Sequence, residues 1–158
     1  MEESKRDNIK NSLLTVLCNA TGIYRRTITA EHKANYKIKL KEIIMKLTRK
    51  VDDGSIANRD IRNAIIELKE FCGSIGASQK AINVYLKFYS VISNKDDSVL
   101  KQLDCPIDSF VIKKNKLKKL SLSNLNLEDY EEMQNKLEQK YDMRILADIE
   151  AWDVKKEY

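Results

Sequence analysis

Apolar residues recur at steps of three and four along most of this chain, which is the spacing of one face of an α-helix. The pattern is clearest between residues 58 and 72, after Asn58, whose side chain suits the N-cap of a helix. The residues on its apolar face are Ile61, Ala64, Ile65, Leu68 and Cys72. This segment therefore predicts an amphipathic helix with one buried side.

The same spacing predicts helices over most of the remaining chain. We expect them over about 5–18, 30–51, 78–92, 106 to 117 or 120, 127–141 and 144–156, with a short helical turn ending near Leu103. Pro106 suits the first position of its helix, because proline lacks the N–H that a first turn leaves unpaired. Ile107, Phe110 and Val111 would then face inward. The helix over 78–92 is apolar on most sides, so we predict that it is the most buried.

Glycine and proline are scarce, with 4 and 1 residues, whereas a fold of many short strands needs frequent turn residues. The length of 158 residues suits one domain with its own apolar core. We therefore predict an all-α fold without β-sheet: a compact multi-helix bundle that forms a single domain over 1–158.

The sequence has no run of roughly 18 apolar residues, as a membrane span requires, and its first residues lack the apolar core of a signal peptide. Cys18, Cys72 and Cys105 are odd in number and widely spaced, and His32 is the single histidine. Such a set matches neither a disulfide framework nor a zinc or iron–sulfur site. We expect a cytoplasmic protein with reduced thiols, no metal, no other cofactor and no membrane partner.

The net charge is +5, and its distribution is uneven. Residues 1–50 carry 12 Lys and Arg against 5 Asp and Glu, residues 51–123 carry 12 against 9, and residues 124–158 carry 5 against 10. A basic body suits DNA, because binding to phosphates releases condensed counterions. The acidic segment 124–158 would bind a protein partner or screen the basic face. A lysine-rich composition also arises without any such ligand.

Two short motifs carry the candidate chemistry. Gly73-Ser74-Ile75-Gly76 forms a glycine-rich hairpin between two predicted helices, and Lys80 lies near the start of the second helix. Pro106-Ile107-Asp108 opens a later helix and would place a carboxylate at its start. Together the motifs offer one amine and one carboxylate, and we expect the bend at 73–76 to bring the two groups to one hollow.

This order of elements resembles the helix–hairpin–helix DNA glycosylase superfamily over about residues 71–117. In that family a hairpin with two glycines precedes a helix with the catalytic lysine, and a later helix begins at the catalytic aspartate. Cys72 stands here in place of the hairpin proline, and Ser78 in place of the usual lysine. The resemblance implies that Lys80 attacks the sugar C1′ as a nucleophile and that Asp108 stabilises the developing positive charge.

The resemblance also implies how DNA would be held. Backbone N–H groups of the hairpin would bind a phosphate, and the target base would turn out of the duplex into a pocket. Basic side chains elsewhere would add contacts to phosphates. The candidate DNA-binding residues are Gly73, Ser74, Ile75, Gly76, Arg25, Arg26, Lys113, Lys114 and Lys116.

Each motif also has a purely structural interpretation. Lys80 could belong to a solvated polar stripe with Asn83 and Lys87. Asp108 could simply cap its helix, and the two hairpin glycines could form only a helix end and a turn. The lysines over 113–119 also complement the dipole at a helix C-terminus.

The aromatic residues Tyr85, Tyr89 and Trp152 are expected to pack in the core rather than to stack on a base. The alternative function is then a non-enzymatic helical interaction or adaptor protein, such as a defence-associated accessory factor. A third interpretation is nonspecific nucleic-acid binding without chemistry.

Overall fold

The computed structural model describes residues 2–20, 30–72 and 74–152. Within these ranges the backbone forms α-helices and one short 3₁₀ helix and no strand, which confirms the predicted all-α class. The elements are α1 (Glu3–Ala20), α2 (Ala30–Asp53), α3 (Asn58–Cys72), α4 (Ile75–Ile92), α5 (Asp97–Leu100), α6 (Ser109–Asn115), η1 (Leu122–Asn124), α7 (Leu127–Lys140) and α8 (Ile145–Ala151).

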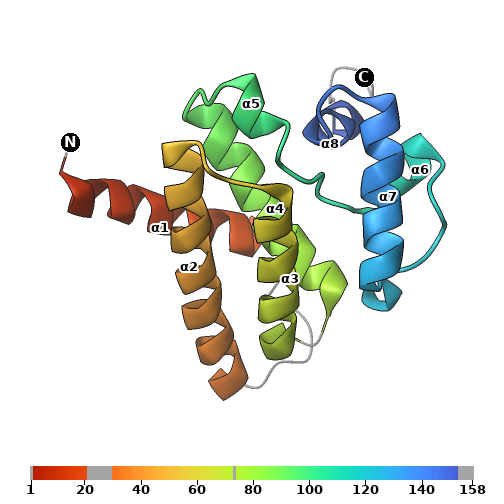
Figure 1. Ribbon diagram of the computed structural model, residues 1–158. Coiled ribbons are helices and arrows are strands. Elements are labelled where there is room, and N and C mark those ends of the chain that lie inside the picture. Colours follow the sequence, from red (N-terminus) through yellow and green to blue (C-terminus); the bar gives the residue numbers. More distant parts are fainter. Residues whose placement is uncertain (1, 21–29, 73, 153–158) are drawn as a thin grey trace.

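The helix α4 is the centre of the bundle, as its all-round apolar sequence predicted. It contacts α1, α2, α3, α5 and η1. In Figure 1, α2 and α3 run antiparallel in front of α4, while α6, α7 and α8 form a second group beyond it. Its fully buried side chains include Ile82, Tyr85 and Leu86.

The core between α2, α3 and α4 follows the predicted helical spacing. Leu40 and Ile44 of α2 are fully buried, and so are Ile61, Ile65 and Leu68 of α3. Burying an aliphatic side chain of this size contributes roughly 1.5–3 kcal/mol, so the stripe is a main source of stability in this half.

The link between α5 and α6 is extended, and its residues 103–108 are all buried. Gln134 of α7 accepts from the Cys105 N–H at 2.9 Å and donates to the Cys105 carbonyl at 2.7 Å. Gln79 of α4 binds both backbone groups of Ile107 in the same way, at 3.0 and 2.8 Å. Because a buried backbone group without a partner costs about 1–3 kcal/mol, these two amides make the buried link tolerable.

Several predicted helix ends were wrong. Asn58 is not the N-cap of α3: its side-chain amide donates to Asp104, and the first turn is closed by Asp60, which accepts from the Ala57 N–H at 2.9 Å. Pro106 is not the first residue of α6, because the Asp108 carboxylate caps the helix two residues later. This helix then ends at Asn115, before Lys116, which has a left-handed backbone with φ of 54°.

The second helix of the predicted hairpin begins three residues earlier than the predicted start at about residue 78. The helix α4 begins at Ile75, where Ser74 caps it by accepting from the Ala77 N–H at 3.2 Å. Gly76 therefore lies inside the helix, and it packs against the backbone of η1. A Cβ at this position would come within 2.0 Å of the Leu122 carbonyl oxygen, so the close approach of the two segments requires glycine.

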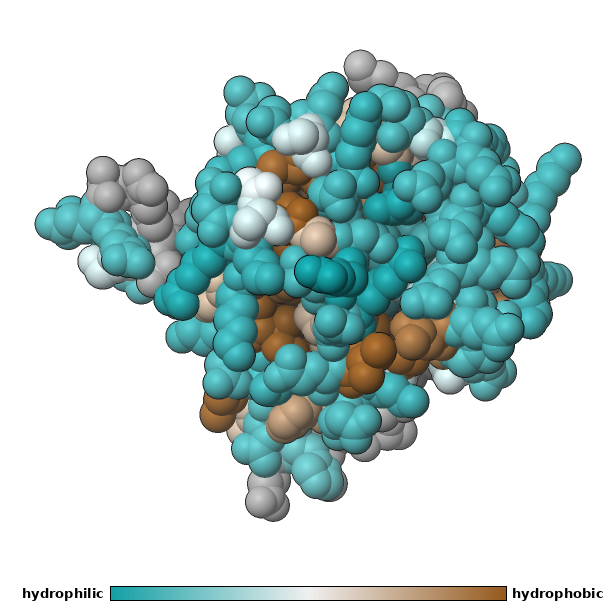
Figure 2. Space-filling view, in the orientation of Figure 1, coloured by the Kyte–Doolittle hydropathy of each residue, from teal (hydrophilic) through white to brown (hydrophobic). Residues whose placement is uncertain are grey.

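Hydrophilic side chains cover most of the face shown in Figure 2, and apolar side chains are exposed there in smaller areas. Among the described residues, none of the helices combines the length and apolarity that crossing a bilayer requires.

We predict that Gly76→Ala destabilises the fold by about 1–3 kcal/mol, because the added methyl group must push α4 away from Leu122. Gly54→Ala is the matched control: Gly54 has φ of 76° but no atom within 4 Å of an added Cβ, so only backbone strain of about 1 kcal/mol is expected. Urea denaturation compares the two variants, and an equal loss in both would contradict the packing argument.

Candidate functional site

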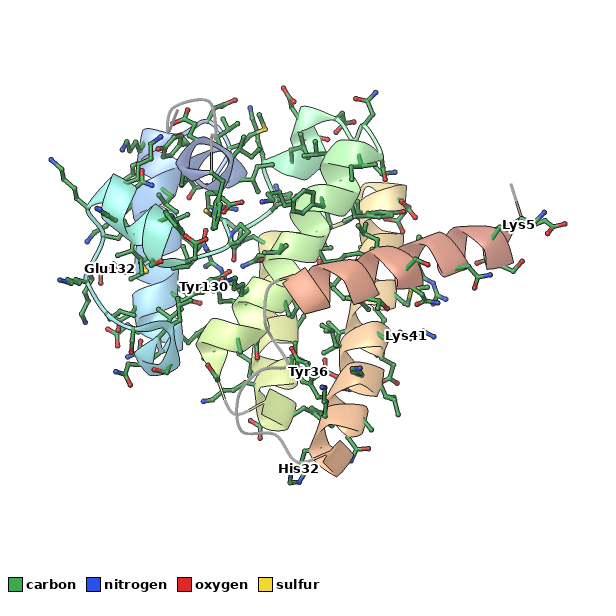
Figure 3. All side chains as sticks on the ribbon, turned by 180° about the vertical axis from the view of Figure 1, so that it is seen from behind. Lys5, His32, Tyr36, Lys41, Tyr130 and Glu132 are labelled. Atoms are coloured by element: carbon green, nitrogen blue, oxygen red, sulfur yellow. The ribbon has the colours of Figure 1, made fainter. Side chains whose placement is uncertain are left out.

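One polar stripe of α4 faces the link, α7 and α8 rather than bulk solvent. Gln79 binds the Ile107 backbone, Asn83 donates to the Tyr130 hydroxyl at 2.9 Å, and Lys87 pairs with Asp148 of α8. Figure 3 shows Tyr130 on α7 beside α4. The interpretation of this stripe as a solvated helix face is therefore wrong for Asn83 and Lys87. Lys80, the third residue of that predicted stripe, is half-buried.

Asp108 is a buried carboxylate with both oxygens engaged. Its Oδ1 accepts from the Val111 N–H at 2.9 Å, which caps α6, and its Oδ2 accepts from the Trp152 indole N–H at 2.8 Å. The predicted capping role is thus confirmed. The second bond joins the start of α6 to the end of α8 and fixes the orientation of the carboxylate.

Asp148 lies on α8 with only 3% of its side chain exposed, and it forms an ion pair with Lys87. Burial raises the pKa of this carboxyl above its ordinary value of 3.8, while the Lys87 ammonium opposes the rise. Asp108 and Lys80 also act on the pKa of Asp148, the first raising it and the second lowering it. Of these groups, Lys87 is the one in direct contact with Asp148 among the described residues.

The predicted convergence of Lys80 and Asp108 is supported by their neighbours in the chain. The Gln79 amide, one residue before Lys80, holds the Ile107 backbone, one residue before Asp108. Both groups also act on the pKa of Asp148, which Asp108 raises and Lys80 lowers. Within the described residues Lys80 forms no ion pair, unlike Lys87, so its amine is the available one.

Two aromatic side chains border this cluster, against expectation. Phe110 was predicted to face inward but is 46% exposed, and Trp152, predicted to pack in the core, is 53% exposed. Their ring centroids are 4.5 Å apart with the planes tilted by 54°. The turn that places Asp108 at the helix start rotates Phe110 outward. The pair forms an aromatic surface next to Asp108.

The thiol of Cys105 is close to the cluster but is not a second nucleophile. Burial, with Asp148 and Asp108 nearby, raises its pKa well above the ordinary value of 9.0. It is fully buried, so the neutral thiol is a packing group. Among the described residues, no group of three or more His, Cys, Asp and Glu side chains is arranged to hold a metal ion.

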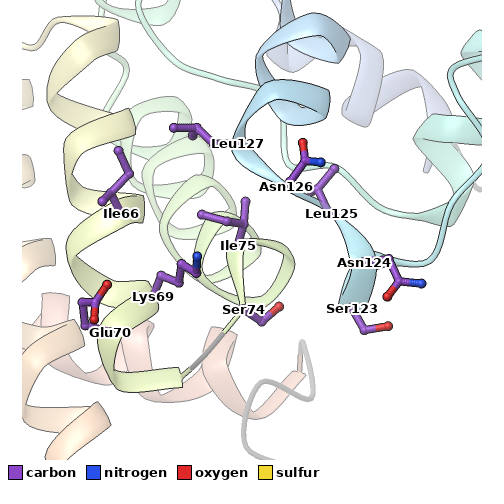
Figure 4. Close-up of a pocket in the computed structure, with 10 residues that line it drawn as sticks. All are labelled: Ile66, Lys69, Glu70, Ser74, Ile75, Ser123, Asn124, Leu125, Asn126 and Leu127. Carbon is purple, nitrogen blue, oxygen red and sulfur yellow. The ribbon is translucent and has the colours of Figure 1, made fainter.

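The candidate phosphate-binding segment borders a pocket of about 380 Å³ between the ends of α3, α4 and α7. Figure 4 shows Ser74 and Ile75 at the start of α4, with Lys69 of α3 on one side of them and Ser123 and Asn124 on the other. The Leu122 carbonyl covers the Cα of Gly76, so a phosphate cannot approach Gly76 from that side. The remaining hairpin candidate, Gly73, and the pair Arg25 and Arg26 lie outside the described residues.

The lysines at the end of α6 are only partly available to a ligand. Lys114 donates to the Glu150 backbone carbonyl at 3.0 Å and so ties α6 to α8. Lys113 and Lys116 are exposed and form no ion pair within the described part of the chain. Their contact with phosphates stays a prediction.

Several acidic residues of the C-terminal segment form ion pairs within the chain, most of them at the surface. Glu138 pairs with Arg144 at 2.8 Å, and Asp129 pairs with Lys118 at 2.9 Å. Further acidic residues of the segment that pair with Lys or Arg are Glu131, Glu132, Asp142 and Asp148. These contacts leave less acidic charge for a protein partner than the sequence predicts.

Two other candidates are placed away from the cluster. Tyr85 is fully buried and stacks on Tyr89, with centroids 5.9 Å apart, and the Tyr89 hydroxyl donates to Asp52 at 2.7 Å. This confirms core packing for Tyr85. His32 is exposed at the start of α2 (Figure 3).

Lys87 and Asp148 were missed as site residues, although the sequence held a signal for each. Lys87 lies two turns after Lys80, on the same face of α4. Asp148 follows Ile145 by three residues and precedes Trp152 by four, so it is an acidic residue on an otherwise apolar helix face.

We found no match for this chain among protein-family models, curated proteins or solved structures. The resemblance to helix–hairpin–helix glycosylases stays a prediction.

We predict that Gln79→Met destabilises the protein by about 2–5 kcal/mol, because the Ile107 N–H and carbonyl lose their shared partner inside the fold. Gln139→Met is the control, since Gln139 is exposed on α7 and its replacement should change stability by less than about 0.5 kcal/mol. Thermal and urea unfolding measure both. Equal stability of the two variants would disprove the role of the Gln79 amide.

We predict that Asp148 makes the free energy of unfolding depend on pH in the acid range. Its pKa is raised in the fold, so its titration adds stability below its ordinary value of 3.8, and this contribution is lost as the pH rises through the folded-state pKa. Asp148→Asn does not titrate. The difference in unfolding free energy should therefore shift in favour of the wild type as the pH falls from 7 to about 3.5. A difference that is constant with pH would show that burial does not control this carboxyl.

Proposed function

We propose that this protein binds DNA in the cytoplasm and excises a damaged base, with Lys80 as nucleophile and Asp108 as the stabilising carboxylate. The observation that carries the proposal is the group of Lys80, Asp108 and Lys87 around Asp148, in which Lys87 pairs with Asp148 while Lys80 has no ion-pair partner within the described residues. An ordinary polar stripe on a helix surface needs neither these charged groups nor the exposed rings of Phe110 and Trp152 beside Asp108.

The proposed reaction uses groups already in place. The lone pair of the Lys80 amine forms a bond to C1′ as the glycosidic bond breaks, and the departing base takes the bonding electrons and the proton that the Lys80 nitrogen gives up. The nitrogen lone pair then forms the C=N bond as the C1′–O4′ bond breaks, and O4′ takes a proton from solvent, which leaves a Schiff base between Lys80 and C1′. Asp108, fixed by Val111 and Trp152, would stabilise the positive charge that develops on the sugar.

The surroundings of the cluster suit a base turned out of the duplex. The exposed rings of Phe110 and Trp152 offer a stacking surface next to Asp108. Lys113 and Lys116, at the other end of the seven-residue helix α6, would contact phosphates on the same side. Ser74 and Ile75 would bind a phosphate at the pocket beside Lys69. The paired acidic residues of α7 count against the adaptor alternative.

The test is borohydride trapping on duplexes that contain an abasic site or an oxidised base. Wild-type protein should form a covalent adduct, and Lys80→Met should form none, because no other amine replaces the attacking group. Asp108→Asn should slow trapping by about 10²-fold, as loss of a charge-stabilising group does. The control is Lys41→Met on the outer face of α2, labelled in Figure 3, which should trap like the wild type.

Peptide mapping of the adduct identifies the attached lysine. An adduct that persists in Lys80→Met, or no adduct with the wild type on any of these duplexes, would refute the proposed chemistry. Duplex affinity that falls steeply with salt, without an adduct, would support nonspecific binding instead.

A further inference from the structure

The indole of Trp152 occupies a small site that Phe110 and Asp108 form at the start of α6. Its N–H donates to the Asp108 Oδ2 at 2.8 Å, and its ring contacts the Phe110 ring with centroids 4.5 Å apart. With the indole in place, Asp108 is only 7% exposed. A ligand that is to reach Oδ2 therefore has to displace the indole.

The position of Trp152 allows its side chain to leave while α8 stays folded. Trp152 follows Ala151, the last residue of α8, and its backbone N–H is bound to the Asp148 carbonyl at 3.1 Å. The residue is 53% exposed, so much of the indole already lies in solvent. Rotation about the side-chain bonds of Trp152 is therefore enough to open the site.

The chemistry of the site decides what can replace the indole. The indole is a planar heteroaromatic ring with an N–H donor at its edge, and a nucleobase has the same two features. Phe110, 46% exposed, offers a ring face for stacking. The vacated Oδ2 needs a donor, because a buried charged group without a partner is costly. A phosphate has no ring to stack and repels the carboxylate, so the site fits a base.

We propose that Phe110 and Asp108 form a binding site for an unpaired nucleobase, which Trp152 occupies in the free protein and vacates when the base enters. The base stacks on Phe110 and donates an N–H to Oδ2, while the Val111 N–H keeps Oδ1 in place. The inference rests on the proposed function for the source of the base, a nucleotide turned out of DNA. It concerns the binding step, before any bond is made or broken.

Trp152 is the single tryptophan of the chain, so the intrinsic fluorescence of the protein reports on this indole. The probes are two duplexes of the same sequence with one bulged nucleotide, which carries adenine in the first and a base-free tetrahydrofuran analogue in the second. The adenine duplex should shift the emission to longer wavelength and raise quenching by acrylamide, because the indole moves into solvent. The base-free duplex keeps every phosphate and should do neither.

Variants at the two rings test the parts of the site, with the affinity measured by the anisotropy of a labelled adenine duplex. Phe110→Leu should weaken binding by about tenfold, since stacking on an aromatic ring is lost. Phe71→Leu is the matched control, because Phe71 on α3 is 40% exposed and its replacement should leave the affinity unchanged.

Trp152→Phe lacks the N–H that competes for Oδ2, so it should bind the adenine duplex about tenfold more tightly than the wild type. A purely structural role of Trp152 predicts an unchanged or lower affinity, which would contradict displacement. Circular dichroism checks that each variant is folded.

Three results of the fluorescence experiment count against the inference. A base that stacks on the outer face of Trp152 would shield the indole and lower quenching by acrylamide. Equal fluorescence with the two duplexes, whether changed or unchanged from the free protein, would show that no base enters the site. Free adenosine that binds as tightly as the adenine duplex would overturn DNA as the source of the base.

The inference and the proposed function fail in different ways. A fluorescence shift with the adenine duplex, without a borohydride adduct on any damaged duplex, would support the base site and refute the chemistry. An adduct without the shift would support the chemistry and overturn the base site.

Discussion

Two buried glutamines hold the extended link 103–108, and the rest of the structure depends on them. An extended segment inside an all-α fold has no neighbouring strand to satisfy its backbone. Gln79 and Gln134 replace that strand, because each amide offers one donor and one acceptor to a single residue of the link. Pro106, between the two bound residues, has no N–H that would need a partner. The link can therefore run between α4 and α7 without orphaned groups at Cys105 and Ile107.

A second network anchors the start of the same link. Asp104 is fully buried and accepts from the Tyr130 hydroxyl at 2.6 Å, with Arg144 at 3.3 Å. Burial beside Asp104 raises the pKa of Tyr130 well above its ordinary value of 10.0, so the phenol keeps the proton that it donates. Arg144 also donates to the Leu103 carbonyl at 3.3 Å. Removing one partner from such a buried pair costs about 3–5 kcal/mol, more than the intact pair contributes, so the network enforces one arrangement of α3, α7 and α8.

Local patterns predicted the helices, and long-range polar contacts decided what the patterns could not. The spacing of apolar residues identified α2, α3 and the central α4, because burial of one face repeats with the helix period. The predicted helix ends were wrong where a side chain binds a residue far away in sequence: Asn58 binds Asp104, which is 46 residues away. The predicted site lacked Lys87 and Asp148 for the same reason, since nothing near Lys87 in sequence indicates that Asp148 is its partner. Candidate residues were predictable by type, and their partners were not.

The backbones that carry Lys80 and Asp108 are joined by a contact that the sequence does not indicate. The bend at 73–76 was expected to bring the two side chains to one hollow, whereas Gly76 packs against Leu122. The amide of Gln79, one residue before Lys80, instead binds the backbone of Ile107, one residue before Asp108. The packing of the start of α4 against η1 and the attachment of α4 to the link are thus separate contacts. A change at Gly76 acts on the first, whereas the position of the link at Ile107 relative to α4 depends on the amide of Gln79.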